Sequence, residues 1–377
     1  MAKQEQQMSV SDFNLAKINT KELSSHVGAT IQIGGNIAIF GRRGTGKTEI
    51  SKQEIKKAGM HEVYLNLSVM ERVDLGGYPN IMGMSEADRL NRKFVNFLMP
   101  QFYQPMIEGK RPVVLLLDEV DKADQSLWAP LLELTQFRSM NGLALPNLYA
   151  TIMTGNLISE GGARPSLPLL DRAEKYLVEA DVTSWMNWAG KSGHIHPSIT
   201  AFINDNPKDL LGAVDPDDRY ADPSPRGWTR ASDILFRGEE KGWSSEMLHN
   251  KVRGCVGKDA GIRYSLYYDH YQKLLPMVER VYKEENISRE YTALDPSQQL
   301  ITCMIACARL ANHLDQVHDA DPPPALKLMG RFLQYVSHEN VLAAVRSQVT
   351  IDRIVQFSLD ENQDWQDIIS RINQKVD

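Results

Sequence analysis

The chain has little cysteine and no long apolar stretch, and each shortage excludes a class of protein. Its 377 residues include three cysteines, which are too few for a disulfide framework and suit a reducing compartment. No apolar run approaches the roughly 20 residues that a membrane-spanning helix needs. The opening residues, MAKQEQQMSV, lack the basic segment and apolar segment of a secretory signal. We therefore expect a cytoplasmic protein that does not enter a membrane.

The charge balance is acidic. The formal net charge is −6 at pH 7, with 42% hydrophobic and 24% charged residues, a composition typical of globular domains. A negative protein is poorly suited to coat nucleic acid, although a local basic channel is compatible with it. The length allows two or three domains.

Short apolar runs alternate with helical patterns in the first half of the chain. The runs NIAIF, EVYLNLS, PVVLLLDEV and LYATIMTGN read as strands, and TEISKQEIKKAG and SLWAPLLELTQF read as helices. This alternation predicts an α/β fold with a doubly wound parallel sheet. Ligands of such sheets bind at the carboxyl ends of the strands.

Two segments interrupt the alternation, and both have features of hairpins. Residues 72–98 contain a Gly-Gly pair, and residues 138–147 contain an Asn-Gly pair, which strongly favours a tight hairpin turn. Beyond about residue 191 only helical patterns remain.

The sequence therefore predicts four parts. Residues 1–35 are polar and are expected to form an N-terminal extension with a short helix near 11–25. An α/β nucleotide-binding domain follows over 36–190, then a helical lid over 191–257 and a C-terminal helical domain over 258–377.

The segment GRRGTGKT matches the phosphate-binding loop in full, with a strand before it and a helix after it. Its glycines let successive backbone N–H groups point at phosphates, and the helix adds its positive end. Lys47 is expected to reach the terminal phosphates, and the Thr48 hydroxyl to bind Mg²⁺. The predicted nucleotide-binding residues of the loop are Gly41, Arg42, Arg43, Gly44, Thr45, Gly46, Lys47 and Thr48.

Two acids end the most apolar strand, VVLLLDEVDKAD. Asp118 is expected to hold Mg²⁺ through water, and Glu119 to orient and deprotonate the attacking water. The next charged residues, Asp121, Lys122 and Asp124, are expected to form an exposed turn.

Four motifs in this order, GRRGTGKT, LLLDEVDKA, IMTGN and PLLDR, resemble those of the AAA+ ATPases. The two hairpins and SPRGWTRASDIL narrow the resemblance to the MoxR-like group, which includes cobalt-chelatase-type subunits and the dynein-related AAA type. The resemblance covers roughly residues 30–257.

The resemblance implies roles for residues outside the loop. Asn156 corresponds to the sensor that helps to position water. Arg172 corresponds to the arginine finger that acts on the nucleotide of a neighbouring subunit, with Arg164 as a rival for that role. Arg226 corresponds to the second sensor in the lid, although Arg230, one helical turn on, could face the site instead.

Two further positions remain open. Asn66 can match the polar switch residue that restrains the catalytic glutamate, or it can simply end its strand. In the hairpin, Tyr78, Met82 and Met84 can offer adaptable apolar contacts to a partner, or they can pack on the core.

By resemblance, the chain hydrolyses ATP to ADP and phosphate with Mg²⁺, in a ring that is a hexamer in the family. The implied partner is a protein client that the ring remodels, and a von Willebrand factor A protein is one candidate. The alternatives are a nucleic-acid motor or DNA-processing ATPase, and a nucleotide-gated scaffold. The intact Glu119 disfavours the scaffold, and the acidic balance disfavours the nucleic-acid motor.

Overall fold

The computed structural model divides into two compact units, Met1–Ala180 and Asp181–Asp377. Each unit is described by itself. The predicted first domain extends to residue 190, but α8 (Val182–Ser192) packs on helices of the second unit. The described residues are 15–80, 97–158, 165–192, 195–212, 223–316, 324–348, 366 and 368.

The first unit is built on a six-stranded sheet of order β1-β10-β2-β9-β6-β3, in which every neighbouring pair is parallel. The predicted parallel α/β fold with an additional helical region is therefore confirmed. Because the strands run in one direction, the residues that follow β2, β6 and β9 meet at one edge of the sheet. The strands are β1 (Ala16–Ile18), β2 (Asn36–Gly41), β3 (His61–Asn66), β6 (Val113–Asp118), β9 (Leu148–Gly155) and β10 (Glu174–Val178).

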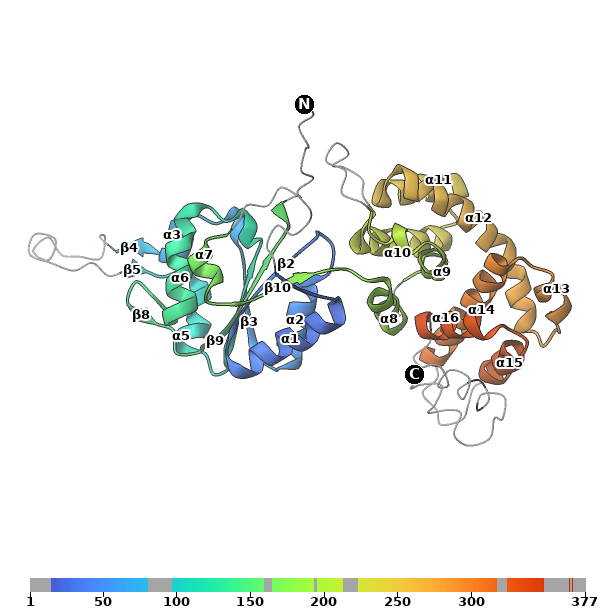
Figure 1. Ribbon diagram of the computed structural model, residues 1–377, viewed down its shortest axis with the longest axis horizontal. Coiled ribbons are helices and arrows are strands. Elements are labelled where there is room, and N and C mark those ends of the chain that lie inside the picture. Colours follow the sequence, from blue (N-terminus) through green and yellow to red (C-terminus); the bar gives the residue numbers. More distant parts are fainter. Residues whose placement is uncertain are drawn as a thin grey trace, which may run out of the picture. The chain divides into compact units, whose positions relative to one another are not determined.

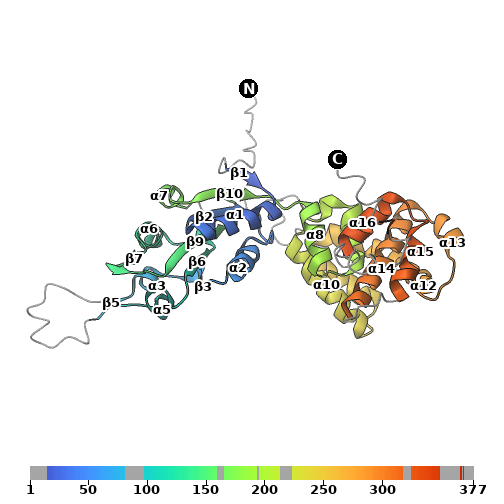
Figure 2. The same cartoon turned by 90° about the horizontal axis from the view of Figure 1, so that it is seen from below.

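Helices cover both faces of this sheet (Figures 1 and 2). Side chains alternate along β2: Ile37 and Ile39 join one apolar cluster, and Ala38 and Phe40 join the other. This double burial explains why the strands read as continuous apolar runs. One face carries α1 (Thr20–Ile33) and α2 (Lys47–Lys57), and the other carries α3 (Arg72–Gly76), α5 (Gln104–Glu108), α6 (Trp128–Phe137) and α7 (Leu167–Leu170).

The residues before the phosphate loop differ from the predicted extension. The strand β1 pairs with β10, and α1 buries Leu23, Val27 and Ile31 against the sheet. A capping box at Asn19 starts the helix, and Gly34, with φ of 66°, ends it in the left-handed region. The short helix expected near 11–25 overlaps only the first residues of α1, which continues to Ile33.

Both predicted hairpins are present. The first pairs β4 (Tyr78–Pro79) with β5 (Phe97–Leu98), and the second pairs β7 (Ser139–Met140) with β8 (Leu143–Ala144). At the tip of the second, Asn141 and Gly142 have φ of 49° and 79°. Positive φ at both central residues is the signature of the tight turn that Asn-Gly favours.

The second unit is entirely helical over its described residues and has one hydrophobic core. The predicted lid and C-terminal domain share this core, since α11 and α12 pack against each other across residue 257. Its helices after α8 are α9 (Pro197–Asp205), α10 (Pro225–Glu240), α11 (Ser245–Val256), α12 (Lys258–Val281), α13 (Ser288–Thr292), α14 (Pro296–Gln316), α15 (Pro324–Leu333) and α16 (His338–Gln348).

The close approach of β2 to β10 leads to a stability prediction. A Cβ added at Gly41 would lie 2.5 Å from the carbonyl oxygen of Val178, so Gly41→Ala must push the two strands apart. We expect a loss of roughly 1–3 kcal/mol in the free energy of unfolding, as for other overpacked sites, measured by urea denaturation.

Gly28→Ala, in the middle of helix α1, is the matched control. Its new methyl group would meet only Glu54 Oε2, at 3.4 Å. Equal stability of the two variants would contradict the prediction.

Candidate functional site

The loop between β2 and α2 has the backbone that phosphate binding requires. Gly44 and Gly46 adopt φ of 76° and 88°, which side chains other than glycine rarely allow. The Thr45 hydroxyl donates to the carbonyl of Arg42 at 2.8 Å and closes the turn. Helix α2 begins at Lys47 after a glycine N-cap, so no capping side chain competes for the first N–H groups of the helix.

Lys47 links the loop to the neighbouring strand. Its side chain is only 7% exposed. Its Nζ donates to the carbonyls of Gly41 and Arg42, both at 2.8 Å, and to Asn156 Oδ1 at 3.4 Å. The fold thus brings together Lys47 and Asn156, two of the predicted site residues, beside the phosphate loop.

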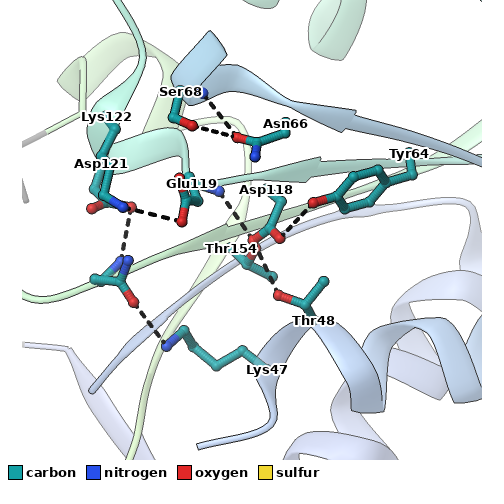
Figure 3. A network of polar contacts seen from close by, with 11 residues as sticks. Lys47, Thr48, Tyr64, Asn66, Ser68, Asp118, Glu119, Asp121, Lys122 and Thr154 are labelled. Atoms are coloured by element: carbon teal, nitrogen blue, oxygen red, sulfur yellow. Dashed lines mark hydrogen bonds and ion pairs between the residues drawn. The ribbon is translucent and has the colours of Figure 1, made fainter. Parts of the chain in front are cut away.

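The carboxylate of Asp118 collects donors from several elements (Figure 3). Its Oδ1 accepts from Thr48 Oγ1 and from the backbone N–H of Glu119, each at 3.0 Å, and from the Thr154 hydroxyl. Its Oδ2 accepts from the Tyr64 hydroxyl at 3.0 Å. These contacts join β3, β6, β9 and α2 at one point.

Tyr64 is a member of this site that the sequence analysis missed. Burial and the negative charge of Asp118 raise the pKa of its phenol to about 12. It therefore keeps its proton and remains a donor to Asp118 at physiological pH. The sequence contains one indication of this contact. Tyr64 lies two residues before Asn66, so both side chains point to the same face of their strand.

The pair of Thr48 and Asp118 fits Mg²⁺. A hydroxyl and a carboxylate oxygen lie within hydrogen-bond distance of each other beside the phosphate loop. Mg²⁺ prefers such oxygen ligands, and it keeps several waters when one or two protein groups bind it beside phosphates.

Glu119 lies directly after β6 with φ of 56° and ψ of 41°, a left-handed conformation that is uncommon for this residue type. Its Oε1 forms an ion pair with Lys122 Nζ at 3.0 Å.

The side chain of Asn66 caps the 3₁₀ turn Leu67–Val69 that follows β3. Its Oδ1 accepts from Ser68 N at 3.0 Å and from Ser68 Oγ at 2.7 Å. A switch role for Asn66 stays a prediction.

The prediction of an exposed turn is wrong for Asp121. Lys122 and Asp124 are exposed, but Asp121 is 1% exposed, and its Oδ1 accepts from the backbone N–H of Asn156 at 2.9 Å. The short 3₁₀ turn η3 (Val120–Lys122) directs this one acid inward, which a run of charged letters does not reveal. Burial raises the pKa of its carboxyl.

Arg172 lies at the amino ends of the strands, whereas the phosphate loop of its own chain lies at their carboxyl ends. Its carbonyl accepts from Asn36 Nδ2 at 3.0 Å, at the first residue of β2, whereas the loop follows the last. A six-residue strand spans roughly 20 Å at about 3.3 Å per residue. The guanidinium donates to Gln136 Oε1 at 2.6 Å and to the Pro168 carbonyl.

Other predicted positions are less constrained. Arg226 and Arg230 lie one turn apart in the first half of α10, in the second unit, and their sensor roles stay predictions. Tyr78 is 57% exposed at the base of the first hairpin. Arg164, Met82 and Met84 lie outside the described residues.

No protein-family model matches the chain, and no curated protein matches it. Among solved structures, it is similar to the RuvB Holliday junction branch migration motor of Thermotoga maritima, with 11% identity and a TM-score of 0.37, over 71% of this chain and 78% of RuvB. Two point variants of that protein give TM-scores of 0.37 and 0.38 with the same coverage. A likeness this distant carries no argument about activity, so the functional conclusion rests on the site itself.

None of the described helices has the length and apolar character needed to span a bilayer.

The environment of Tyr64 predicts an unusual titration. An ordinary tyrosine is half ionised near pH 10, whereas a phenol with a pKa of about 12 stays neutral through pH 10.5. NMR of ring-labelled tyrosine can follow this signal, which its loss in Tyr64→Phe identifies. Half ionisation at pH 10 would contradict the described contact with Asp118.

Proposed function

We propose that the chain is an Mg²⁺-dependent AAA+ ATPase of the MoxR-like group, which acts as a hexameric ring and remodels a protein partner. The observation that carries the ATPase proposal is the meeting of the phosphate loop, Thr48, Asp118, Glu119 and Asn156 at one edge of the parallel sheet. Each of these residues supplies a different part of phosphoryl transfer.

ATP binds with its phosphates against the loop N–H groups and the start of α2. Lys47 offers its ammonium to the terminal phosphates, at the point where it now contacts the loop carbonyls and Asn156. Thr48 and, through water, Asp118 would hold Mg²⁺, which would neutralise charge on the phosphate oxygens. The four donors on Asp118 keep its carboxylate in place for this task.

Hydrolysis needs a base beside the terminal phosphate. Glu119 accepts a proton from water as the water oxygen bonds to the γ-phosphorus, and the bond from phosphorus to the bridging oxygen breaks to release ADP. The Glu119–Lys122 ion pair must open for this step, so that the carboxylate oxygen is free to accept a hydrogen bond from the attacking water. Asn156, held at the end of β9, orients the water.

The placement of Arg172 supports the proposed ring. At the amino-end edge it is remote from its own nucleotide, yet a second copy could receive its guanidinium. Such an arginine stabilises charge in the transition state and can raise the rate by several powers of ten. In this proposal an isolated subunit is incomplete.

The first hairpin is the proposed contact surface for the client. Tyr78, Phe97 and Leu98 are 57%, 41% and 57% exposed on its two short strands. Exposed aromatic and aliphatic side chains on two paired strands suit a protein partner, and a von Willebrand factor A protein is the candidate that the family resemblance implies. A nucleic-acid motor is the second candidate, and the net charge of −6 disfavours it.

The proposed chemistry predicts a separation of binding from turnover. Glu119→Gln keeps the shape of the site but cannot take the proton, so it should bind ATP with near wild-type affinity and hydrolyse it at least roughly 100-fold more slowly. Purified with ATP from its native host, this variant should retain a stoichiometric protein that a Lys47→Ala control loses.

Nuclease-sensitive nucleic acid in place of that protein would overturn the protein-remodelling proposal and favour the motor. Normal turnover by Glu119→Gln would remove the role assigned to Glu119.

The placement of Arg172 predicts that two inactive variants restore each other. Lys47→Ala lacks a working nucleotide site but retains Arg172, and Arg172→Ala has the reverse defect. In randomly mixed rings about a quarter of the interfaces join an intact site to an intact arginine, so phosphate release should reappear on mixing. No recovery would show that Arg172 does not act on a neighbour, and full activity of Arg172→Ala alone would exclude the residue altogether.

A further inference from the structure

Asp121 is a buried charged group that the proposed reaction does not use. It lies in the turn η3, two residues after Glu119 and one before the Lys122 that pairs with Glu119. Its carboxylate faces the end of β9, where Oδ1 accepts from the N–H of Asn156 at 2.9 Å. The turn that carries the proposed base is therefore bonded directly to the sensor residue.

The contact continues to the phosphate loop. Asn156 Oδ1 accepts from Lys47 Nζ at 3.4 Å, and that ammonium also contacts the carbonyls of Gly41 and Arg42. The contacts thus run from Asp121 through Asn156 to Lys47. A shift at Asp121 would move the backbone of Asn156, and with it the side chain that contacts Lys47.

Burying this carboxylate is costly. Its Oδ2 has no hydrogen-bond partner among the described residues, and a buried polar atom without a partner destabilises a fold. The backbone is fitted closely around the group, because a Cβ added at Gly155 would lie 3.1 Å from Oδ1 and 2.9 Å from Phe40. Structure that accepts such a cost beside a reaction centre points to a role in the reaction.

We infer that Asp121 is a positioning residue for ATP hydrolysis. It holds Asn156 so that the carboxamide stands at the correct distance from the loop and from the water that Glu119 activates. Its essential contribution is the hydrogen bond to the Asn156 N–H. This inference rests on the proposed ATPase function.

The test compares Asp121→Leu, which has no acceptor, with Asp121→Asn, which keeps a carbonyl oxygen for the Asn156 N–H. Because a misplacement of about 1 Å can cost up to 100-fold in rate, Asp121→Leu should lower kcat by roughly 10- to 100-fold. Its KM for ATP should change by no more than about threefold, since ground-state binding is retained. Asp121→Asn should restore kcat to within about threefold of wild type.

A double-mutant cycle separates positioning from general structural damage. Asn156→Ala alone removes the carboxamide, so adding Asp121→Leu to it should lower kcat no further. A merely structural role would instead multiply the two losses. Asp124→Asn is the matched control and should leave kcat unchanged. Asp124 is an exposed acid of the same region, and its Oδ1 accepts from the backbone N–H of Ser126.

Three results would overturn the inference: wild-type kcat in Asp121→Leu, a loss in Asp121→Asn as large as that in Asp121→Leu, or multiplicative losses in the cycle. If Asp121→Leu does not fold, Asp121→Ala replaces it in the same comparisons. Failure of the ATPase proposal is distinguishable, because the wild-type chain would then release no phosphate at all.

Discussion

The site depends on one carboxylate at the end of one strand. Asp118 accepts hydrogen bonds from Thr48, Tyr64, Thr154 and the N–H of Glu119, and thereby fastens α2 and two neighbouring strands to β6. Three of these donors are neutral hydroxyls, so they orient the carboxylate without cancelling its charge, which remains available to a metal ion. The parallel sheet makes this convergence possible, because it brings the ends of β2, β6 and β9 to one edge.

The sheet also separates two functions. Its carboxyl-end edge carries the groups proposed to bind and hydrolyse ATP, and its amino-end edge carries Arg172, whose carbonyl contacts the first residue of β2. Because one strand length separates these edges, we propose that Arg172 acts on the nucleotide of a neighbouring subunit and not on that of its own. In the proposed ring, each interface would bring the carboxyl-end edge of one subunit to the amino-end edge of the next. Hydrolysis would then require a neighbouring subunit.

The strongest local patterns predicted the structure well. The phosphate loop, the acid-ended strand and the Asn-Gly hairpin depend on short-range backbone chemistry, which neighbouring residues determine. Other features depend on tertiary contacts. The inward turn of Asp121 requires the end of β9 beside it, and Tyr64 joins the site because β3 lies beside β6 with Asn66 opposite Asp118. The sequence predicts only a short helix near 11–25 in an extension, because the apolar face of α1 becomes part of the core only when it packs against the sheet. These tertiary contacts cannot be predicted from a local pattern of charged or polar residues.

The measurement that tests the central claim most directly is equilibrium binding of ATP to the purified wild-type chain by calorimetry, with and without Mg²⁺, followed by phosphate release from the same sample. We predict one nucleotide per chain, binding that Lys47→Ala abolishes, and phosphate release that requires Mg²⁺. Absence of ATP binding, or equal binding by wild type and Lys47→Ala, would contradict the assignment of the strand-end site as the place of ATP hydrolysis.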